Sequence, residues 1–404
     1  MHLNYLALAI PFFIGLMYLE YYLSKKKNKA DNFNFNEAVA NINVGIAERL
    51  SDLFTTGLFY LFFVWINKNF ALFDIQPMLI TWVLLFLFTD LMWYWYHRFG
   101  HKVNLFWSVH VVHHQSDDYN FTVSARITVF QAVARCLFWS VLPVIGFPAE
   151  MITVFLLIHG TYPFFTHTQL IGKLGWLEYF LVTPSHHRVH HSSNPQYLDK
   201  NFGDVLIIWD KLFGTFAEEK ENPVYGLTKP LNSHSFLWQH FHFLLEIIVA
   251  FKRAKGFIQK FKCIFGKPDD IDSRIRPVLE KRLSFKTQEL THSSQLLTYI
   301  KGQTIVSLIV LFLLILFEHY FSTDKIFVLA LFIILSLVTT GAMLEQRHWI
   351  FHLEFTRLTL LGIFTWLNYP YFNLAMFLMG MATVVILFYK TIGRKYSTFL
   401  YSYK

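Results

Sequence analysis

Histidines are concentrated in two short windows of the chain. Residues 97–114 read HRFGHKVNLFWSVHVVHH and residues 183–191 read TPSHHRVHH, so nine of the 19 histidines fall there. Imidazoles packed together beside lipid would carry unsatisfied ring nitrogens, at about 1–3 kcal/mol each. A bound metal ion removes this penalty, because neutral imidazole is a good ligand for iron, zinc, copper and nickel. The windows therefore predict a transition-metal site, and the size of the set predicts two ions.

Spacing within the windows indicates how the rings are presented. The first window contains an H-x3-H pair and an H-x2-H-H triplet, and the second window repeats the triplet. Rings three and four residues apart lie on one face of a helix, so each pattern is expected to project from one face. Thr183 or Ser185 is the expected N-cap in the second window, beside the helix-restricting Pro184. His186 would point about 100° away from His187.

The composition indicates where this site lies. Of the 404 residues, 54% are hydrophobic, 19% aromatic and only 15% charged, which is too apolar for an ordinary soluble domain and predicts a membrane protein. The net charge is +8, but the basic residues cluster beside apolar runs, as at 25–29 and 251–262, which suits the cytoplasmic face of a membrane. No nucleic-acid partner is expected. The two cysteines, Cys136 and Cys263, fit a reducing compartment.

Apolar runs long enough to cross a bilayer divide the chain. A longer apolar region at about 127–167 is broken by Pro143, Gly146 and Pro148, and it is expected to form two short spans that return to the side they left. If the basic stretch at 25–29 is cytoplasmic, both histidine windows face the cytoplasm. The other expected spans begin near Tyr5 or lie at about 51–66, 78–96, 303–321, 325–344, 354–369 and 372–391.

These elements define the expected architecture. It is an all-α, multi-pass integral membrane protein with a cytoplasmic, histidine-rich di-metal cap on the helix ends. Residues 1–270 are expected to form a membrane-embedded catalytic domain. Residues 271–404 are expected to form a linker and a four-span transmembrane domain, because KPDDIDSRIRP near 267–277 is typical of a boundary. The aromatic and basic stretch at about 235–265 is expected to lie in the membrane interface.

The histidine patterns HRFGH, HVVHH and HRVHH resemble the three histidine boxes of the fatty acid hydroxylase and sterol desaturase superfamily. Within it, HKVNLFWSVHVVHHQSDDYNFTVSAR and LEYFLVTPSHHRVHHSSNPQYLDKNFGDVLIIWDKLFGTF resemble the alkylglycerol monooxygenases, a pterin-dependent family that cleaves ether lipids. The resemblance covers about residues 35–265 and, more loosely, the C-terminal spans. It implies a non-haem di-iron centre, O2 as the oxidant, and hydroxylation of an alkyl C–H bond of an alkylglycerol with release of a fatty aldehyde.

The resemblance also implies which residues form the catalytic centre. His167, in FFTHTQL at the end of the broken apolar region, is the expected further metal ligand. One departure is Lys102, which stands where the alkylglycerol monooxygenases have an acidic residue. Tetrahydrobiopterin and another reductant, including an electron-donor protein, therefore stay open as alternatives. The catalytic ligands of the two iron ions would be His97, His101, His110, His113, His114, His187, His190 and His191.

Further polar and aromatic residues are expected around the rings. Carboxylate and amide side chains are candidates to accept ring N–H groups, with helix capping as the alternative, and two aromatic residues are candidates to line the site. The polar candidates are Asp117, Asp118, Asn201 and Asp204, and the aromatic candidates are Tyr119 and Trp209.

Two other functions stay open at this point. One is sterol or fatty-acyl hydroxylation or desaturation on the same metal centre. The other is a membrane metal transporter, although a transporter is expected to place its ligands at mid-membrane on broken helices. The partners expected for the enzyme are the membrane itself and a lipid substrate from the bilayer.

Overall fold

The computed structural model describes residues 3–29, 32–283 and 292–401. Within these residues the chain is helical, with an isolated β-bridge between Leu181 and Leu206, so the prediction of an all-α fold is confirmed. The helices up to the second histidine window are η1 (Tyr5–Leu8), α1 (Ala9–Lys26), α2 (Phe35–Phe70), α3 (Leu79–Lys102), α4 (Asn104–His110), α5 (Phe121–Ser124), α6 (Gln131–Trp139), α7 (Val141–Ile145), α8 (Ala149–Thr161), η3 (Tyr162–Thr166), η4 (Gly175–Tyr179) and α9 (Pro184–His190). Those that follow are α10 (Ile208–Leu212), α11 (Phe236–Arg253), α12 (Phe257–Phe265), η5 (Pro268–Asp270), α13 (Ile275–Arg282), α14 (Ser294–Leu316), η6 (Glu318–Tyr320), α15 (Thr323–Leu344), α16 (Ile350–Asn368), α17 (Phe372–Leu387) and α18 (Tyr389–Tyr401).

Six helical segments of the described chain are long and apolar enough to cross a membrane: η1 with α1, α2, α3, α14, α15 and α16. The pair α17 and α18 passes the same test together but bends by 84°. These segments make the chain an integral membrane protein. The expected second span, 51–66, lies within α2, which is a single helix of 36 residues. It begins well before the apolar run, where the side chain of Asn34 accepts hydrogen bonds from the backbone of Asn36 and Glu37.

The broken apolar region forms short helices. Gly146 ends α7 with a φ of 124°, and a Cβ atom there would lie 2.0 Å from the carbonyl oxygen of Phe73. Only glycine fits this turn. Pro148 is then the N-cap of α8. The two arms are therefore α6 with α7, and α8, and each is shorter than the six segments above.

The chain divides into two compact units. One contains residues 1–15, 232–238 and 286–404, so far as the structure describes them, and the other contains residues 16–231 and 239–285. In the first, the guanidinium of Arg357 on α16 donates to Glu354 and to Gln303 of α14, each at 2.7 Å. These buried polar groups satisfy one another between apolar helices. The domain boundary expected at residue 270 stays a prediction.

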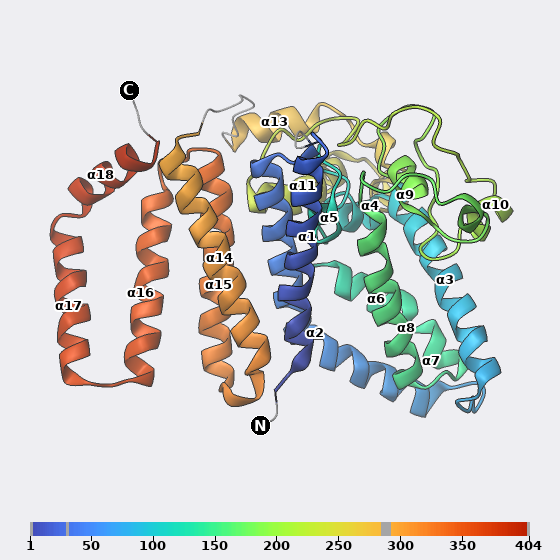
Figure 1. The fold of residues 1–404 in the computed structure, drawn as a ribbon, viewed down its shortest axis with the longest axis horizontal. Helices are drawn as coiled ribbons and strands as arrows, with labels where there is room; N and C mark the ends of the chain where they lie inside the picture. Colours follow the sequence, from blue (N-terminus) through green and yellow to red (C-terminus); the bar gives the residue numbers. More distant parts are fainter. Residues whose placement is uncertain (1–2, 30–31, 284–291, 402–404) are drawn as a thin grey trace. The chain divides into compact units, whose positions relative to one another are not determined.

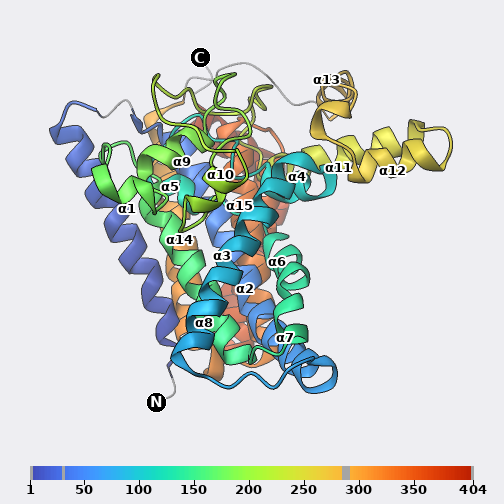
Figure 2. The ribbon, with the colours of Figure 1, turned by 90° about the vertical axis from the view of Figure 1, so that its right-hand side faces the viewer.

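The second unit contains both histidine windows. Its α2, α3 and α8 run alongside one another, and a cap covers one end of them (Figures 1 and 2). We define the cap as residues 103–126 and 162–231, which include α4, α5, α9 and α10. Glu20 of α1 is buried and accepts hydrogen bonds from the backbone of Phe121 and the hydroxyl of Thr168, at 2.7 and 2.5 Å. The first spanning helix is thereby tied to the cap.

The close approach of α2 to the cap leaves no room for a side chain at Gly45. A Cβ atom at Gly45 would lie 2.8 Å from both the Cβ and the carbonyl oxygen of Ala125, whereas one at Gly57 on the same helix would meet nothing within 4 Å. We expect Gly45→Ala to destabilise the protein by about 1–3 kcal/mol. Gly57→Ala should be neutral or stabilising by up to about 1 kcal/mol, since alanine favours helix. Thermal unfolding in detergent measures both, and equal midpoints would contradict this packing.

Candidate metal centre

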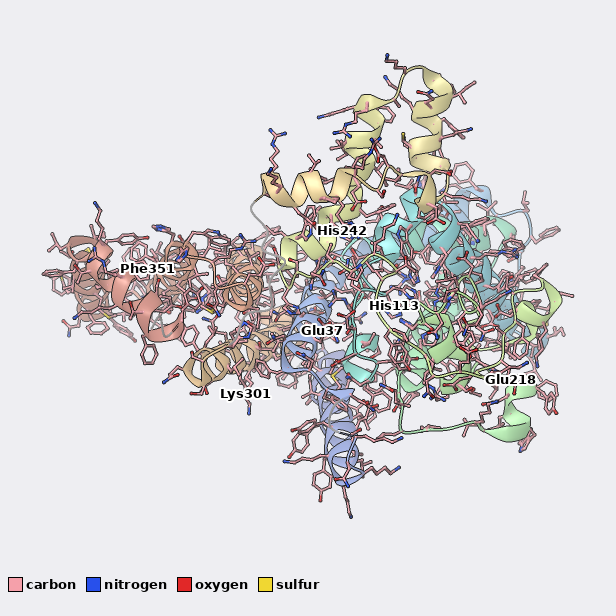
Figure 3. All side chains as sticks on the ribbon, turned by 90° about the horizontal axis from the view of Figure 1, so that it is seen from above. Glu37, His113, Glu218, His242, Lys301 and Phe351 are labelled. Carbon is pink, nitrogen blue, oxygen red and sulfur yellow. The ribbon has the colours of Figure 1, made fainter. Side chains whose placement is uncertain are left out.

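The predicted site residues converge into two groups of imidazoles. The rings come from α3, from α4 and the turn after it, from the segment after η3 and from α9. In each group one nitrogen per ring lies within 4.8 Å of the others. Seen from the cap end, His113 lies in the middle of this unit (Figure 3). The five-histidine group is His97, His101, His110, His114 and His190, and the four-histidine group is His113, His167, His187 and His191.

Each H-x2-H-H box is divided between the two groups. The outer two rings of the first box join the five-histidine group, whereas its middle ring, His113, joins the four-histidine group. In the second box the outer two rings join the four-histidine group, and its middle ring, His190, joins the five-histidine group. The three rings of the first box still contact one another, with centroids 4.8–5.5 Å apart, so one face presents rings to both groups.

Backbone carbonyls fix the tautomer of several rings. A carbonyl oxygen can only accept a hydrogen bond, so the Nδ1 atom that faces it carries the hydrogen, and the Nε2 atom of the neutral ring keeps a free lone pair. This is the usual way in which metal-binding imidazoles are oriented. The pairs are His97 with Phe202 at 2.9 Å, His113 with Arg126 at 3.2 Å, His167 with Pro163 at 2.6 Å and His190 with Lys200 at 3.0 Å.

The free lone pairs point at one another. The Nε2 atoms of His113 and His167 lie 3.2 Å apart, and neither carries a hydrogen that could bridge them. Ligand nitrogens bound to one ion at about 2.0–2.1 Å are separated by about 2.8–3.4 Å, depending on the angle between them. The other Nε2 distances agree with this spacing: 3.0 Å for His97 and His110, 2.9 Å for His110 and His114, 3.2 Å for His101 and His114, 3.1 Å for His167 and His187, and 3.2 Å for His167 and His191.

Burial keeps these rings neutral. Removal from water lowers the pKa of His167 to about 4. Burial also lowers the pKa of His113 and His187 well below the usual value, and the neighbouring rings lower it further. Neutral imidazole is the form that binds metal. The donor set, its spacing and its protonation therefore fit a pair of borderline transition-metal ions.

His186 and Tyr119 lie where the sequence placed them. The Nδ1 atom of His186 faces the carbonyl of Leu181 at 3.2 Å, outside both groups. Tyr119 stacks on His167 with ring centroids 5.5 Å apart. Trp209, in contrast, does not stack on the rings, and its indole N–H donates to Asp90 at 2.8 Å.

Three of the four polar candidates have other partners than the clustered rings. Asp118 accepts from the backbone of Asn34 at 2.5 Å, and burial raises the pKa of its carboxyl to about 7. Asn201 bonds the backbone of Ala217. Asp204 accepts from His159, outside the two groups, at 2.6 Å. These three side chains do not hold the clustered rings, and the role expected for Asp117 stays a prediction. Backbone carbonyl oxygens hold several of the rings instead.

Buried carboxylates anchor the loop that supplies two of those carbonyls. Residues 200–206 contribute the oxygens that hold His190 and His97. Asp210 accepts from the backbone N–H groups of Phe202 and Gly203, both at 2.7 Å. Asp90 accepts from the backbone N–H groups of Val205 and Leu206, at 3.0 and 3.1 Å. Sequence reasoning missed both residues, although a lone carboxylate inside the apolar run of α3 was a signal.

The matches to known proteins agree with this site. The model of the fatty acid hydroxylase family matches residues 82–215, which include all three histidine boxes, so the helical membrane fold and the histidine centre define an oxidoreductase of the fatty acid hydroxylase class. The alkylglycerol monooxygenase of Homo sapiens is 37% identical over 361 residues, covering 85% of this chain and 78% of that protein. That of Danio rerio is 32% identical over 366 residues, covering 89% and 81%. The chain belongs to the alkylglycerol monooxygenase family.

A more distant relative is similar over a shorter part of the chain. Ornithine lipid hydroxylase OlsE of Rhizobium tropici is 29% identical over 147 residues, covering 35% of this chain and 44% of that protein. No solved structure matches the chain. The predicted resemblance to the superfamily and to its alkylglycerol monooxygenase branch is confirmed.

The anchoring of the 200–206 loop predicts how Asp210 acts. In Asp210→Asn, an amide NH2 would face one of the N–H groups that now donate to the carboxylate. A buried donor would lose its partner, which would lower the free energy of unfolding by about 1–3 kcal/mol. We expect a lower midpoint of thermal unfolding and weaker retention of metal against a chelator. Asp269→Asn, at an exposed position, is the matched control. Unchanged metal retention in the Asp210 variant would contradict the role of the loop.

Proposed function

We propose that this protein hydroxylates the carbon next to the ether oxygen of an alkylglycerol, using O2. The observation that carries the proposal is the convergence of nine histidine rings into two groups at the cap end of an apolar helical unit. The relationship to the alkylglycerol monooxygenase of Homo sapiens, 37% identical over 85% of this chain, supports the substrate class.

The five-histidine and four-histidine groups would each hold one iron ion. When bound, these ions supply the activation of O2 that no side chain provides. The chain itself orients the rings through the carbonyls of Arg126, Pro163, Lys200 and Phe202. Tyr119 is buried against the four-histidine group and helps to exclude water, which protects a C–H oxidation from side reactions.

The reaction balances with one reductant. One oxygen atom of O2 enters the C–H bond next to the ether oxygen, and the other leaves as water after taking two electrons and two protons. The product is a hemiacetal. Its C–O bond breaks as the hydroxyl proton passes to the leaving glycerol oxygen, which releases a fatty aldehyde and a free alcohol.

The reductant would be tetrahydrobiopterin or another donor with access from water. A cavity of about 470 Å³ is lined by His101, His114 and His190 and by residues that include the exposed Lys229 and Lys267. Lys102, the departure from the family pattern, lies in its wall and forms an ion pair with Asp199. The lysine charge is therefore compensated within the chain.

We further propose that the cap faces the cytoplasm. The basic residues at 25–29 end α1 and those at 251–262 follow α11, and such residues mark cytoplasmic ends. A metal transporter is disfavoured, because the rings lie at helix ends under a cap rather than at mid-membrane. Hydroxylation of an acyl chain without cleavage is the second candidate, since an ornithine lipid hydroxylase matches part of the chain.

Product analysis tests the reaction. Purified, iron-loaded protein in lipid nanodiscs is supplied with an alkylglycerol, O2 and a reduced pterin, and we expect release of a fatty aldehyde. Aldehyde that requires the pterin would show that Lys102 is compatible with this donor. A hydroxylated lipid without aldehyde would favour the second candidate. No product of either kind, with two reducible iron ions bound, would contradict the proposal.

Ligand removal tests the metal assignment. We expect His113→Ala or His190→Ala to abolish oxidation and to lower the iron content, because each removes one ring from a different group. His186→Ala is the matched control, since this ring is also buried but faces Leu181, and it should keep both ions. Retained turnover in either of the first two variants, measured with membrane insertion intact, would refute these ligands.

A further inference from the structure

Helix α12 follows α11, contacts α4 and extends sideways from the helices of this unit, at an angle to α3 (Figure 2). Gly256, with a φ of 84°, makes the turn between the two helices. The sequence placed the whole stretch 235–265 in the membrane interface. One face of α11 contacts protein, because Phe243 and Ile247 are buried in a core with Val111 and Val112. The interfacial placement of α11 stays a prediction.

One face of α12 is apolar and exposed. Phe257 is 81% exposed and Phe261 is 51% exposed, and Ile258 and Phe265 are exposed beside them. At 100° per residue these four side chains fall within an arc of about 100°. The rings of Phe261 and Phe265 contact each other, with centroids 4.8 Å apart. A contiguous aromatic face on a nine-residue helix indicates a surface that is covered when the protein works.

The charges around this face have one sign. Lys260 and Lys262 flank the apolar arc on its two sides. Exposed basic residues also precede and follow the helix, and no acidic residue occurs from position 247 to position 268. An apolar face bordered by lysines matches the boundary between acyl chains and anionic head groups, where lysines extend toward the head groups. The exposed basic residues outside the helix are Lys252, Arg253, Lys255 and Lys267.

The attachment of α12 fixes its position. Asn104, buried at the start of α4, donates through its backbone N–H to Gly266 at 2.9 Å and through its side chain to Lys262 and Cys263 at 3.3 and 3.2 Å. Asn104 follows the last residue of α3, Lys102, by two positions. The helix is therefore held beside the cap end of a spanning helix.

We propose that α12 is an interfacial helix that binds the anionic surface of the bilayer, with its phenylalanines between the acyl chains and its lysines on the head groups. The residues directly after it, Lys267 and Pro268, line the cavity that reaches the five-histidine group. Binding of α12 to lipid holds the mouth of this cavity at the head-group layer. The inference does not depend on which lipid is oxidised.

Accessibility of a spin label tests the placement. Cys136 and Cys263 are replaced by serine in the full-length chain, and a nitroxide is attached at Phe261→Cys or, as the control on the opposite face, at Gln259→Cys. In nanodiscs with one third anionic phosphatidylglycerol, we expect the label at 261 to collide several-fold more with O2 than with a water-soluble nickel complex. The label at 259 should show the reverse.

Charge variants test the lipid class. In neutral phosphatidylcholine the ratio of collisions with O2 to collisions with nickel at position 261 should fall, and Lys260→Gln with Lys262→Gln should remove its dependence on anionic lipid. Lys281→Gln with Arg282→Gln, an exposed basic pair on α13, should leave that dependence unchanged. A label at 261 that collides mainly with nickel would place the face in water, and one shielded from both reagents would place it under a protein. Either result overturns the proposal, and equal ratios in the two lipids overturn its electrostatic part.

Discussion

The histidine-bearing unit depends on one electrostatic constraint, namely that lone pairs of neutral rings face one another, as those of His113 and His167 do across 3.2 Å without a proton between them. Such an arrangement is repulsive unless a cation is present, and it persists only if each ring is held from behind. Carbonyl oxygens provide that restraint for His97, His113, His167 and His190. Two of those carbonyls, of Lys200 and Phe202, in turn depend on the anchoring of the loop at 200–206 by the carboxylates of Asp90 and Asp210. The buried acids thus act on the centre through the backbone.

Much of this centre was predictable from local sequence. The type and spacing of the histidines predicted a metal site, and the composition predicted spanning helices that end beside it. His167 lies 20 residues before His187, the first ring of the HRVHH box, and only its position after the broken apolar region indicated that it joins the others. The support of the rings was not predictable. A backbone carbonyl has no sequence signature, because every residue carries one, and the choice of Phe202 and Lys200 depends on how a loop folds against α3.

The sequence also did not show which apolar helix faces contact protein. Residues of α11 are as aromatic as those of α12, but Phe243 and Ile247 face a protein core, whereas Phe257 and Phe261 face outward. Periodicity gives an apolar face without saying what covers it. The long α2 shows the same limit, since its first turns are polar enough to read as a loop, yet they are helical and packed beneath the cap.

The division of each H-x2-H-H box between the two groups has a consequence for assembly. Neither group can be completed by one box alone, so no segment of the chain carries a self-sufficient binding site. An ion that entered one group would immobilise backbone that also presents rings to the other, and the conformational entropy lost at that moment would not be lost again when a second ion arrived. The shared chain would thereby couple the two groups, so that metal loading would favour the empty and the fully occupied states over the singly occupied one.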